Sequence, residues 1–248
     1  MRGRYFQAHV EEVYMSHFSC VVFANSPDDF DRLLAPYDEC NSDYFSTFKV
    51  SDEKKESLLN MWKQYGEEES FEDYVTEEGY ILIDGDIFGS CNENAIYDYY
   101  DLDGRYVDFC DCLIDEESDG IRMKDYSFVP KVNEDTVESL KTEWDMFVRF
   151  SQMSEEELKE HRDEYRSLYN PAYIVKRYGS FEQYVKESTA LCPYCFITPD
   201  GVLHAPGTVG WFACDDATAE SFNKYYDEWM QYVTSDVNPF VSFVDCHI

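Results

Sequence analysis

The sequence predicts an α+β fold in which helices pack on a mainly antiparallel sheet. Apolar runs rich in β-branched and aromatic residues, typical of buried strands, occur at 17–24 and at 240–248. Between them lie segments whose apolar residues recur at helical spacing. The turn chemistry of Pro-Asp-Gly at 199–201 favours a hairpin. Together these observations favour the α+β class.

The first elements are predicted to be a strand and two helices. After the strand at 17–24, Ser26 is a good N-cap and Pro27 suits the first helical position. Residues 51–66 are predicted to form a second helix. Its apolar stripe consists of Leu58, Met61, Trp62 and Tyr65.

The region 67–119 differs in composition from the rest of the chain, because it holds nineteen Asp or Glu residues and a single basic residue, Arg105. Two strands are predicted inside it, at 80–83 and 95–110. Asp103-Gly104 is a hairpin turn dipeptide, so the second strand is expected to fold back there.

The following region is predicted to be helical. Ser154 with Glu157, and Ser180 with Gln183, have the spacing of capping boxes. The core stripe of the preceding helix consists of Val137, Leu140, Trp144, Phe147 and Val148.

The C-terminal part is predicted to be a hairpin at 194–207, followed by 209–214, a helix within 216–233 and a closing strand at 240–248. The apolar face of the helix consists of Phe222, Tyr225, Tyr226, Trp229, Met230 and Val233.

The length of 248 residues suits one large domain or two small ones. We expect one α+β domain over 15–248, with two joined halves, 15–130 and 131–248, as the alternative. Residues 1–14 are either a translated leader before a start at Met15 or an ordinary N-terminal extension. They contain no apolar core segment of a signal peptide, and no run in the chain approaches the roughly 20 apolar residues of a membrane span.

The charge and the cysteines restrict the class of partner and the compartment. A net charge of −32 disfavours binding to nucleic acid and suits a basic partner or divalent cations. An aromatic content of 17% excludes a disordered acidic tail. The nine cysteines show no disulfide framework, so we expect reduced thiols in a cytoplasm.

Three short segments carry a resemblance to a known family. They are Met15-Ser-His-Phe with Leu-Ala-Pro-Tyr at 34–37, the central "YDYYDLDGRY" at 97–106, and Val-Asp-Cys-His-Ile at 244–248. With them the chain resembles an uncharacterised family of phages and other bacterial mobile elements, in which Trp is usual at the position of Tyr106. The resemblance implies a phage or prophage origin, and therefore the cytoplasm of an infected or prophage-carrying bacterium. It implies no particular chemistry.

Two motifs partly match the patterns of metal or redox sites. "DGDIFG" at 84–89 begins like a calcium loop, but Phe88 and Ala95 stand where ligands belong, so a turn between strands is predicted. Cys192 and Cys195 have redox spacing, but they precede a strand and no second Cys-x-x-Cys pair completes a zinc site. We expect no cofactor, and neither a phosphate-binding glycine loop nor a serine elbow is present.

The enzyme-like candidates come from the two ends of the chain. Asp245 and His247 share one face of an extended strand, and His17 begins the first strand. If these strands are neighbours, the three side chains meet as a general-base or metal-assisted hydrolytic site. The alternative is a structural polar cluster at the end of a sheet.

The acidic region is the other candidate. Its carboxylates outnumber their possible partners, so many must share a surface, and such a surface imitates the charge of DNA. The predicted partner-binding residues are Asp84, Asp86, Asp98, Asp101, Asp103, Asp108, Asp111, Asp115, Glu116 and Glu117.

Three functions remain open at this point. The leading prediction is a non-enzymatic accessory protein that inhibits a basic nucleic-acid-binding or defence protein of the host, as a DNA mimic. The alternative is a small hydrolase or nucleotide-handling enzyme that uses His17, Asp245 and His247. A virion or assembly component is the third.

Overall fold

The computed structural model describes residues 17–65, 70–102, 104–106, 109–113, 121–130, 132–161, 170–208 and 216–247. Its helices and mostly antiparallel sheets confirm the α+β prediction. The chain forms two compact units, one comprising Leu34–Asp98 and the other the described residues before and after it. These boundaries differ from the halves 15–130 and 131–248. The segments 1–14 and 209–214 lie outside the described residues.

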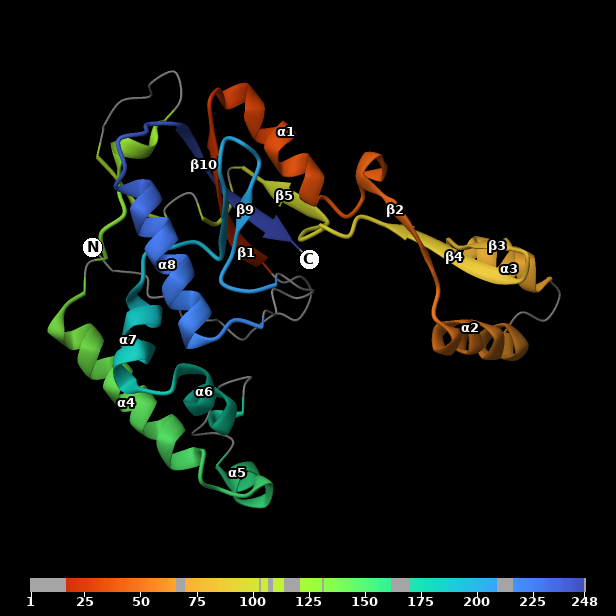
Figure 1. Cartoon of the computed structure of the whole chain (residues 1–248). Helices are drawn as coiled ribbons and strands as arrows, with labels where there is room; N and C mark the ends of the chain where they lie inside the picture. Colours follow the sequence, from red (N-terminus) through yellow and green to blue (C-terminus); the bar gives the residue numbers. More distant parts are fainter. Residues whose placement is uncertain are drawn as a thin grey trace. The chain divides into compact units, whose positions relative to one another are not determined.

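The larger unit contains a five-stranded sheet in the order β5–β10–β1–β8–β9 (Figure 1). Its central strands pair antiparallel over their full length, and the β1–β8 ladder is parallel. The predicted strands at 17–24 and 240–248 are confirmed. The bounds are β1 (His17–Ala24), β5 (Tyr99–Asp101), β8 (Cys195–Ile197), β9 (Leu203–His204) and β10 (Phe240–His247).

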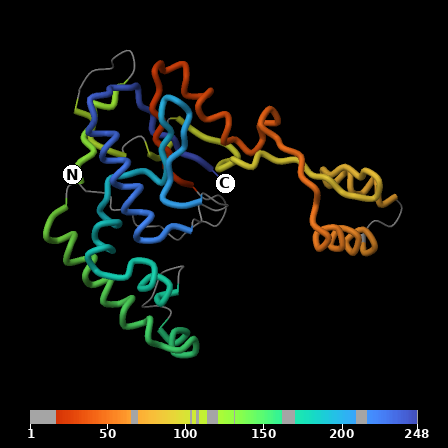
Figure 2. Tube along the Cα trace, viewed as in Figure 1, coloured from red at the N-terminus to blue at the C-terminus, as the bar shows by residue number. Residues whose placement is uncertain are grey.

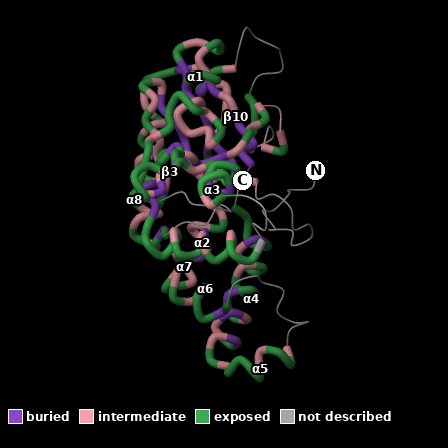
Figure 3. The backbone as a smooth tube through the Cα atoms, turned by 90° about the vertical axis from the view of Figure 1, so that its right-hand side faces the viewer, coloured by how far each residue is buried: buried purple, intermediate pink, exposed green. Residues whose placement is uncertain are grey.

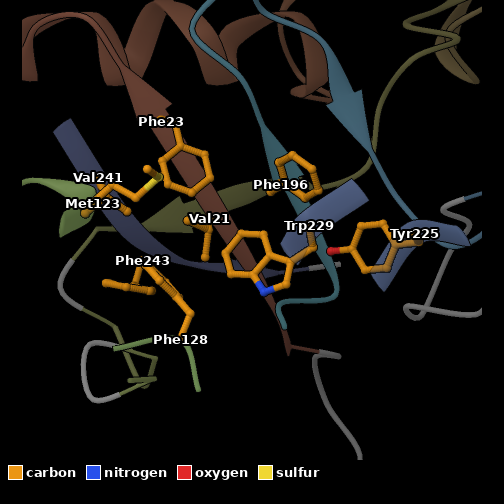
Figure 4. Close-up of a cluster of buried hydrophobic side chains, with 9 residues drawn as sticks. All are labelled: Val21, Phe23, Met123, Phe128, Phe196, Tyr225, Trp229, Val241 and Phe243. Carbon is orange, nitrogen blue, oxygen red and sulfur yellow. The ribbon is translucent and has the colours of Figure 1, made fainter. Parts of the chain in front are cut away.

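One face of this sheet packs against helix α8 (Ala219–Val233). Trp229 is fully buried among Val21, Phe196 and Phe243, which point to the same face of their strands (Figure 4). Its indole N–H donates to the carbonyl of Leu191 at 3.0 Å, so the ring is fixed as well as buried. Figure 3 shows buried positions gathered around β10.

The other face of the sheet carries both apolar side chains, such as Phe18 and Val22, and thiols. The thiols of Cys20, Cys195 and Cys246 are buried there on three neighbouring strands. Tyr100, also on this face, donates its hydroxyl proton to Asp31 at 2.5 Å. Asp31 belongs to α1 (Phe30–Leu34), which follows a 3-10 turn, η1 (Pro27–Asp29), capped by Ser26 as predicted.

The predicted hairpin over 95–110 is wrong for the described residues. β5 pairs with β10 rather than with a returning strand, while β6 (Asp111–Cys112) pairs with β7 (Tyr126–Ser127). Asp103 itself lies outside the described residues. The partner of β5 is β10, which is distant in the sequence. Turn residues indicate only local pairing, so they could not predict this one.

A helical group completes the larger unit. Trp144 and Phe147 of the predicted stripe are buried against Tyr184. The Ser154–Glu157 capping box is confirmed; Ser180 also caps its helix, but the amide of Gln183 donates to Glu187 instead of closing a box. The bounds are η4 (Met123–Asp125), α4 (Glu134–Phe150), α5 (Glu155–Glu160), α6 (Pro171–Tyr178) and α7 (Phe181–Thr189).

The C-terminal hairpin is confirmed. β8 and β9 pair antiparallel, and the backbone N–H of Gly201 donates to the carbonyl of Thr198 at 2.8 Å. Gly201 has a φ of 84°, which glycine adopts at little steric cost. Among the described helices, none is both long enough and apolar enough to cross a membrane.

The smaller unit is a three-stranded antiparallel sheet in the order β2–β4–β3 with two helices. Leu58 is buried with Val75 and Ile87, but Met61 is 40% exposed, so its place in the predicted stripe is wrong. The predicted turn lies at Asp84-Gly85, between β3 and β4. The bounds are η2 (Ala35–Tyr37), η3 (Ser42–Tyr44), β2 (Ser46–Lys49), α2 (Asp52–Tyr65), α3 (Phe71–Glu77), β3 (Ile81–Ile83) and β4 (Asp86–Cys91).

Candidate functional site

The register of the two central strands creates a polar cluster at one end of the five-stranded sheet. His17, the first residue of β1, lies opposite His247, the last residue of β10. Asp245 stands two residues earlier on β10, and side chains two apart in a strand share a face. Figure 2 shows the two strands, red and blue, side by side. We call these three residues the His–Asp–His cluster.

The distances within the cluster place all three side chains in mutual contact. His17 Nδ1 lies 2.9 Å from Asp245 Oδ1, and His247 Nε2 lies 3.8 Å from Asp245 Oδ2. The two imidazole rings have centroids 3.8 Å apart. The condition that the first and last strands are neighbours, on which the prediction depended, is therefore met.

Burial distinguishes the three side chains. Those of Asp245 and His247 are 6% and 8% exposed, whereas that of His17 is 15% exposed. A carboxylate as buried as Asp245 is costly unless it is paired and hydrogen-bonded. His17 is therefore the member of the cluster with the greatest contact with solvent.

Arg105 supplies a second partner for Asp245 that the sequence did not predict. Its Nε lies 3.4 Å from Asp245 Oδ2, and its backbone N–H donates to the same oxygen at 3.3 Å. The Arg105 side chain is 56% exposed, so the guanidinium extends from the carboxylate into solvent. The only signal in the sequence was its position as the single basic residue of the acidic region.

Gly104 explains how the backbone of Arg105 comes so close. A Cβ at this position would lie 2.3 Å from the Cβ of Asp245. No other residue type fits without displacing either the segment around Gly104 or strand β10. The predicted turn glycine is therefore a close-approach glycine that packs on the cluster.

Two tyrosines fix the histidines. The hydroxyl of Tyr106 donates to the carbonyl of His17 at 3.3 Å, and the ring of Tyr99 stacks on His247 with centroids 3.8 Å apart. Burial, together with the charge of Asp245, raises the pKa of Tyr106 to about 12. Tyr106 is consequently a neutral hydrogen-bond donor at physiological pH.

This arrangement suits two kinds of chemistry. When His17 Nδ1 donates to Asp245, Nε2 carries the lone pair of a general base. Alternatively, one atom from each side chain can coordinate a metal ion, because the three ligand atoms lie within 4.8 Å of one another. Both uses draw on an imidazole positioned by a buried carboxylate.

The thiols of Cys192 and Cys195 do not converge. Cys192 packs against the cluster around Trp229, whereas Cys195 contacts Cys20 on the other face of the sheet. Burial raises the pKa of the Cys192 thiol to about 12 and holds that of Cys195 well above its ordinary value. Neither thiol is a ready nucleophile or metal ligand in this fold.

The predicted partner-binding acids are distributed over both units. Asp84, Asp86 and Asp98 belong to the smaller unit, where Lys49 pairs with Asp86 at 2.6 Å. Asp101 and Asp111 are exposed in the larger unit. The remaining five lie outside the described residues; they are Asp103, Asp108, Asp115, Glu116 and Glu117.

Comparison with known protein families, curated proteins and solved structures found no match. Three segments far apart in the sequence contribute residues to the cluster and its contacts. His17 comes from the first, Arg105 from the second, and Asp245 with His247 from the third.

Proposed function

We propose that the chain is a hydrolase or nucleotide-handling enzyme whose reacting centre is the His–Asp–His cluster. The hydrogen bond of 2.9 Å between His17 Nδ1 and Asp245 Oδ1 carries this proposal. A buried carboxylate that accepts from one imidazole nitrogen orients the other nitrogen and stabilises the imidazolium formed when it takes a proton. His17 is also the most exposed member of the cluster.

Each neighbour has a role in this proposal. His17 Nε2 takes a proton from water, and Asp245 holds the ring in the required tautomer. His247 lies beside both groups and binds the reacting group of the substrate. Arg105 meets negative charge on the substrate or leaving group, because its guanidinium is anchored at Asp245 and reaches into solvent.

The test is a turnover panel of nucleotides, phosphate monoesters, phosphate diesters and carboxylic esters with the full chain. Loss of a general base lowers turnover by about 10²- to 10⁴-fold, so His17→Gln is expected to fall within this range. His204→Gln is the matched control, because His204 also contacts a carboxylate, Glu228 at 3.4 Å, away from the cluster. Absence of turnover on every substrate, or equal turnover by His17→Gln and wild type, would refute the proposal.

A second candidate is the acidic inhibitor of a basic host protein. It is favoured by the crowding of carboxylates in the smaller unit, where burial and then the nearby carboxylates Asp98 and Asp38 raise the pKa of Glu39. The whole chain also has an excess of acidic over basic residues, with a net charge of −32. A basic nucleic-acid-binding cleft is the partner that such a surface attracts.

Salt and DNA competition test this second candidate. A partner captured from bacterial lysate at low salt is expected to be released both by high salt and by duplex DNA. Reversal of Asp98 or of Asp101 to Lys, one at a time, should weaken capture, whereas Asp145→Lys, at an exposed acid of α4, is the control with the same change of charge. Capture that resists DNA, or that both reversals weaken equally, would contradict mimicry through the predicted residues.

A further inference from the structure

We infer that the His–Asp–His cluster binds one divalent transition-metal ion of the Zn²⁺ class. One atom each from His17, Asp245 and His247 would coordinate the ion. This inference rests on the hydrolase proposal, whose site it shares, and changes the roles within it. With the ion bound, His17, Asp245 and His247 would be ligands, and the ion would activate the water in place of the His17 base. The inference stands on ligand geometry, ligand chemistry and the supports around the three side chains.

The geometry matches a three-ligand site. Zn–N and Zn–O bonds of about 2.0–2.2 Å in a tetrahedron place neighbouring ligand atoms about 3.3–3.6 Å apart. The observed separations of 2.9 Å and 3.8 Å from Asp245 to His17 and His247 lie on either side of this value. All three ligand atoms lie within 4.8 Å of one another on the paired strands β1 and β10, so one ion between them is within reach of each side chain.

The ligand types select the ion. Two imidazoles and one carboxylate suit zinc, cobalt, nickel or iron, whereas calcium and magnesium prefer sites made of oxygen alone. Three protein ligands leave a fourth position open for water, as catalytic zinc sites do. The ion would lower the pKa of a water molecule bound in this fourth position to about 7.

The surroundings hold the ligands in place. Tyr99 stacks on the ring of His247, and Tyr106 donates to the backbone carbonyl of His17. Such supporting contacts fix ring orientation and typically change metal affinity by about 10- to 100-fold when lost. The net charge of −32 also favours the approach of cations.

In the structure, Asp245 contacts Arg105 Nε at 3.4 Å and His17 Nδ1 at 2.9 Å. If His17 binds the ion through Nδ1, the proton of the neutral ring lies on Nε2, so the ion takes the place of the contact between His17 Nδ1 and Asp245. The exposed guanidinium of Arg105 competes with the ion for the same carboxylate. Replacing Arg105 with a neutral residue is therefore expected to tighten metal binding, which a purely structural cluster would not show.

The experiment uses the full chain, stripped with a chelator and titrated with Co²⁺ and Zn²⁺. We expect one ion per chain, with the visible absorption of cobalt bound to nitrogen and oxygen ligands and without the charge-transfer band of a thiolate ligand. Asp245→Asn and His247→Gln should each lower affinity by at least the 10- to 100-fold cited for supporting residues. Arg105→Gln should raise affinity several-fold, and His204→Gln should leave it unchanged.

The outcomes separate this inference from the hydrolase proposal. No stoichiometric binding, a thiolate band, or equal affinity in wild type and Asp245→Asn would overturn the metal site. Circular dichroism of the metal-free variants establishes that they fold, and the wild-type cobalt spectrum does not depend on any variant. Stoichiometric metal without turnover would leave the metal site standing and refute the hydrolase. Turnover that survives chelation, in a chain that binds no stoichiometric ion, would refute the metal site and leave the hydrolase standing.

Discussion

His17 and His247 lie directly opposite each other in the β1–β10 ladder, and their rings make contact with centroids 3.8 Å apart. Both rings also approach Asp245, whose carboxylate is almost fully buried. The ladder thus joins the start and the end of the described chain at one site, and several properties of the protein depend on this junction.

Gly104→Ala is expected to distort the junction. The new methyl group would lie 2.3 Å from the Cβ of Asp245, closer than such atoms pack. Overpacking of this kind typically lowers the free energy of unfolding by about 1–3 kcal/mol. Urea unfolding measures the effect. Equal stability of Gly104→Ala and wild type would show that the loop moves away at no cost.

Tyr106→Phe is expected to change the alkaline stability of the protein. The folded pKa of about 12 exceeds the ordinary value of about 10, so the unfolded chain loses this proton first as pH rises. The free energy of unfolding therefore falls between about pH 10 and pH 12, where Tyr126 and Tyr232, also near 12, contribute as well. Urea unfolding at several pH values should show a shallower decline in Tyr106→Phe. An unchanged slope would contradict the burial of this hydroxyl.

Arg177→Met is expected to destabilise the helical group. Arg177 binds both oxygens of Glu187 at 3.0 Å and 2.9 Å, and both side chains are largely buried. Removing one partner of a buried pair lowers the free energy of unfolding by about 3–5 kcal/mol. We expect a loss at the lower end of this range, because Gln183 also donates to Glu187 and would remain as its partner.

The exposed pair of Lys141 and Asp145 on α4 is the control for this prediction. Lys141→Met should cost about 0.5 kcal/mol or less, since exposed pairs within a helix contribute little. Thermal and urea unfolding compare the two variants. The double variant Arg177→Met with Glu187→Leu should be more stable than Arg177→Met alone, because it leaves no buried charge unpaired. Similar losses in both single variants would argue against a buried pair.

The cysteines should differ in reactivity. Cys40, Cys91 and Cys112 are exposed, whereas Cys20 and Cys195 are buried in the five-stranded sheet. Burial blocks access and holds the pKa of Cys195 well above its ordinary value, so little thiolate forms there. Alkylation followed by peptide mapping should label the exposed thiols in the native protein and the buried ones only in denaturant. Rapid native labelling of Cys195 would contradict the packing of the sheet.

Local sequence signals predicted most of the elements. The strands at 17–24 and 240–247 were predictable because short runs rich in β-branched and aromatic residues are typical of buried strands. The prediction that Met61 is buried was wrong. Helical spacing indicates which residues share a face, but the number of them that become buried depends on the sheet beneath the helix. The prediction of a hairpin at Asp103-Gly104 was wrong because β5 pairs with β10.

The site was predictable only in part. Strand alternation placed Asp245 and His247 on one face, but pairing with β1 is a property of the whole fold. Gly104 and Arg105 reach Asp245 from 140 residues away in the sequence, and no local pattern reports such a contact.

The long separation between His17 and Asp245 also has a consequence for biosynthesis. These residues are 228 positions apart. At about 5–20 residues per second, β1 leaves the ribosome roughly 10–50 s before β10 can join it. During this interval its apolar edge lacks its longest ladder partner, which exposes the nascent chain to chaperones and to aggregation. A polypeptide interrupted before β10 would lack two of the three side chains of the cluster, so translation must pass this strand before any chemistry there can begin.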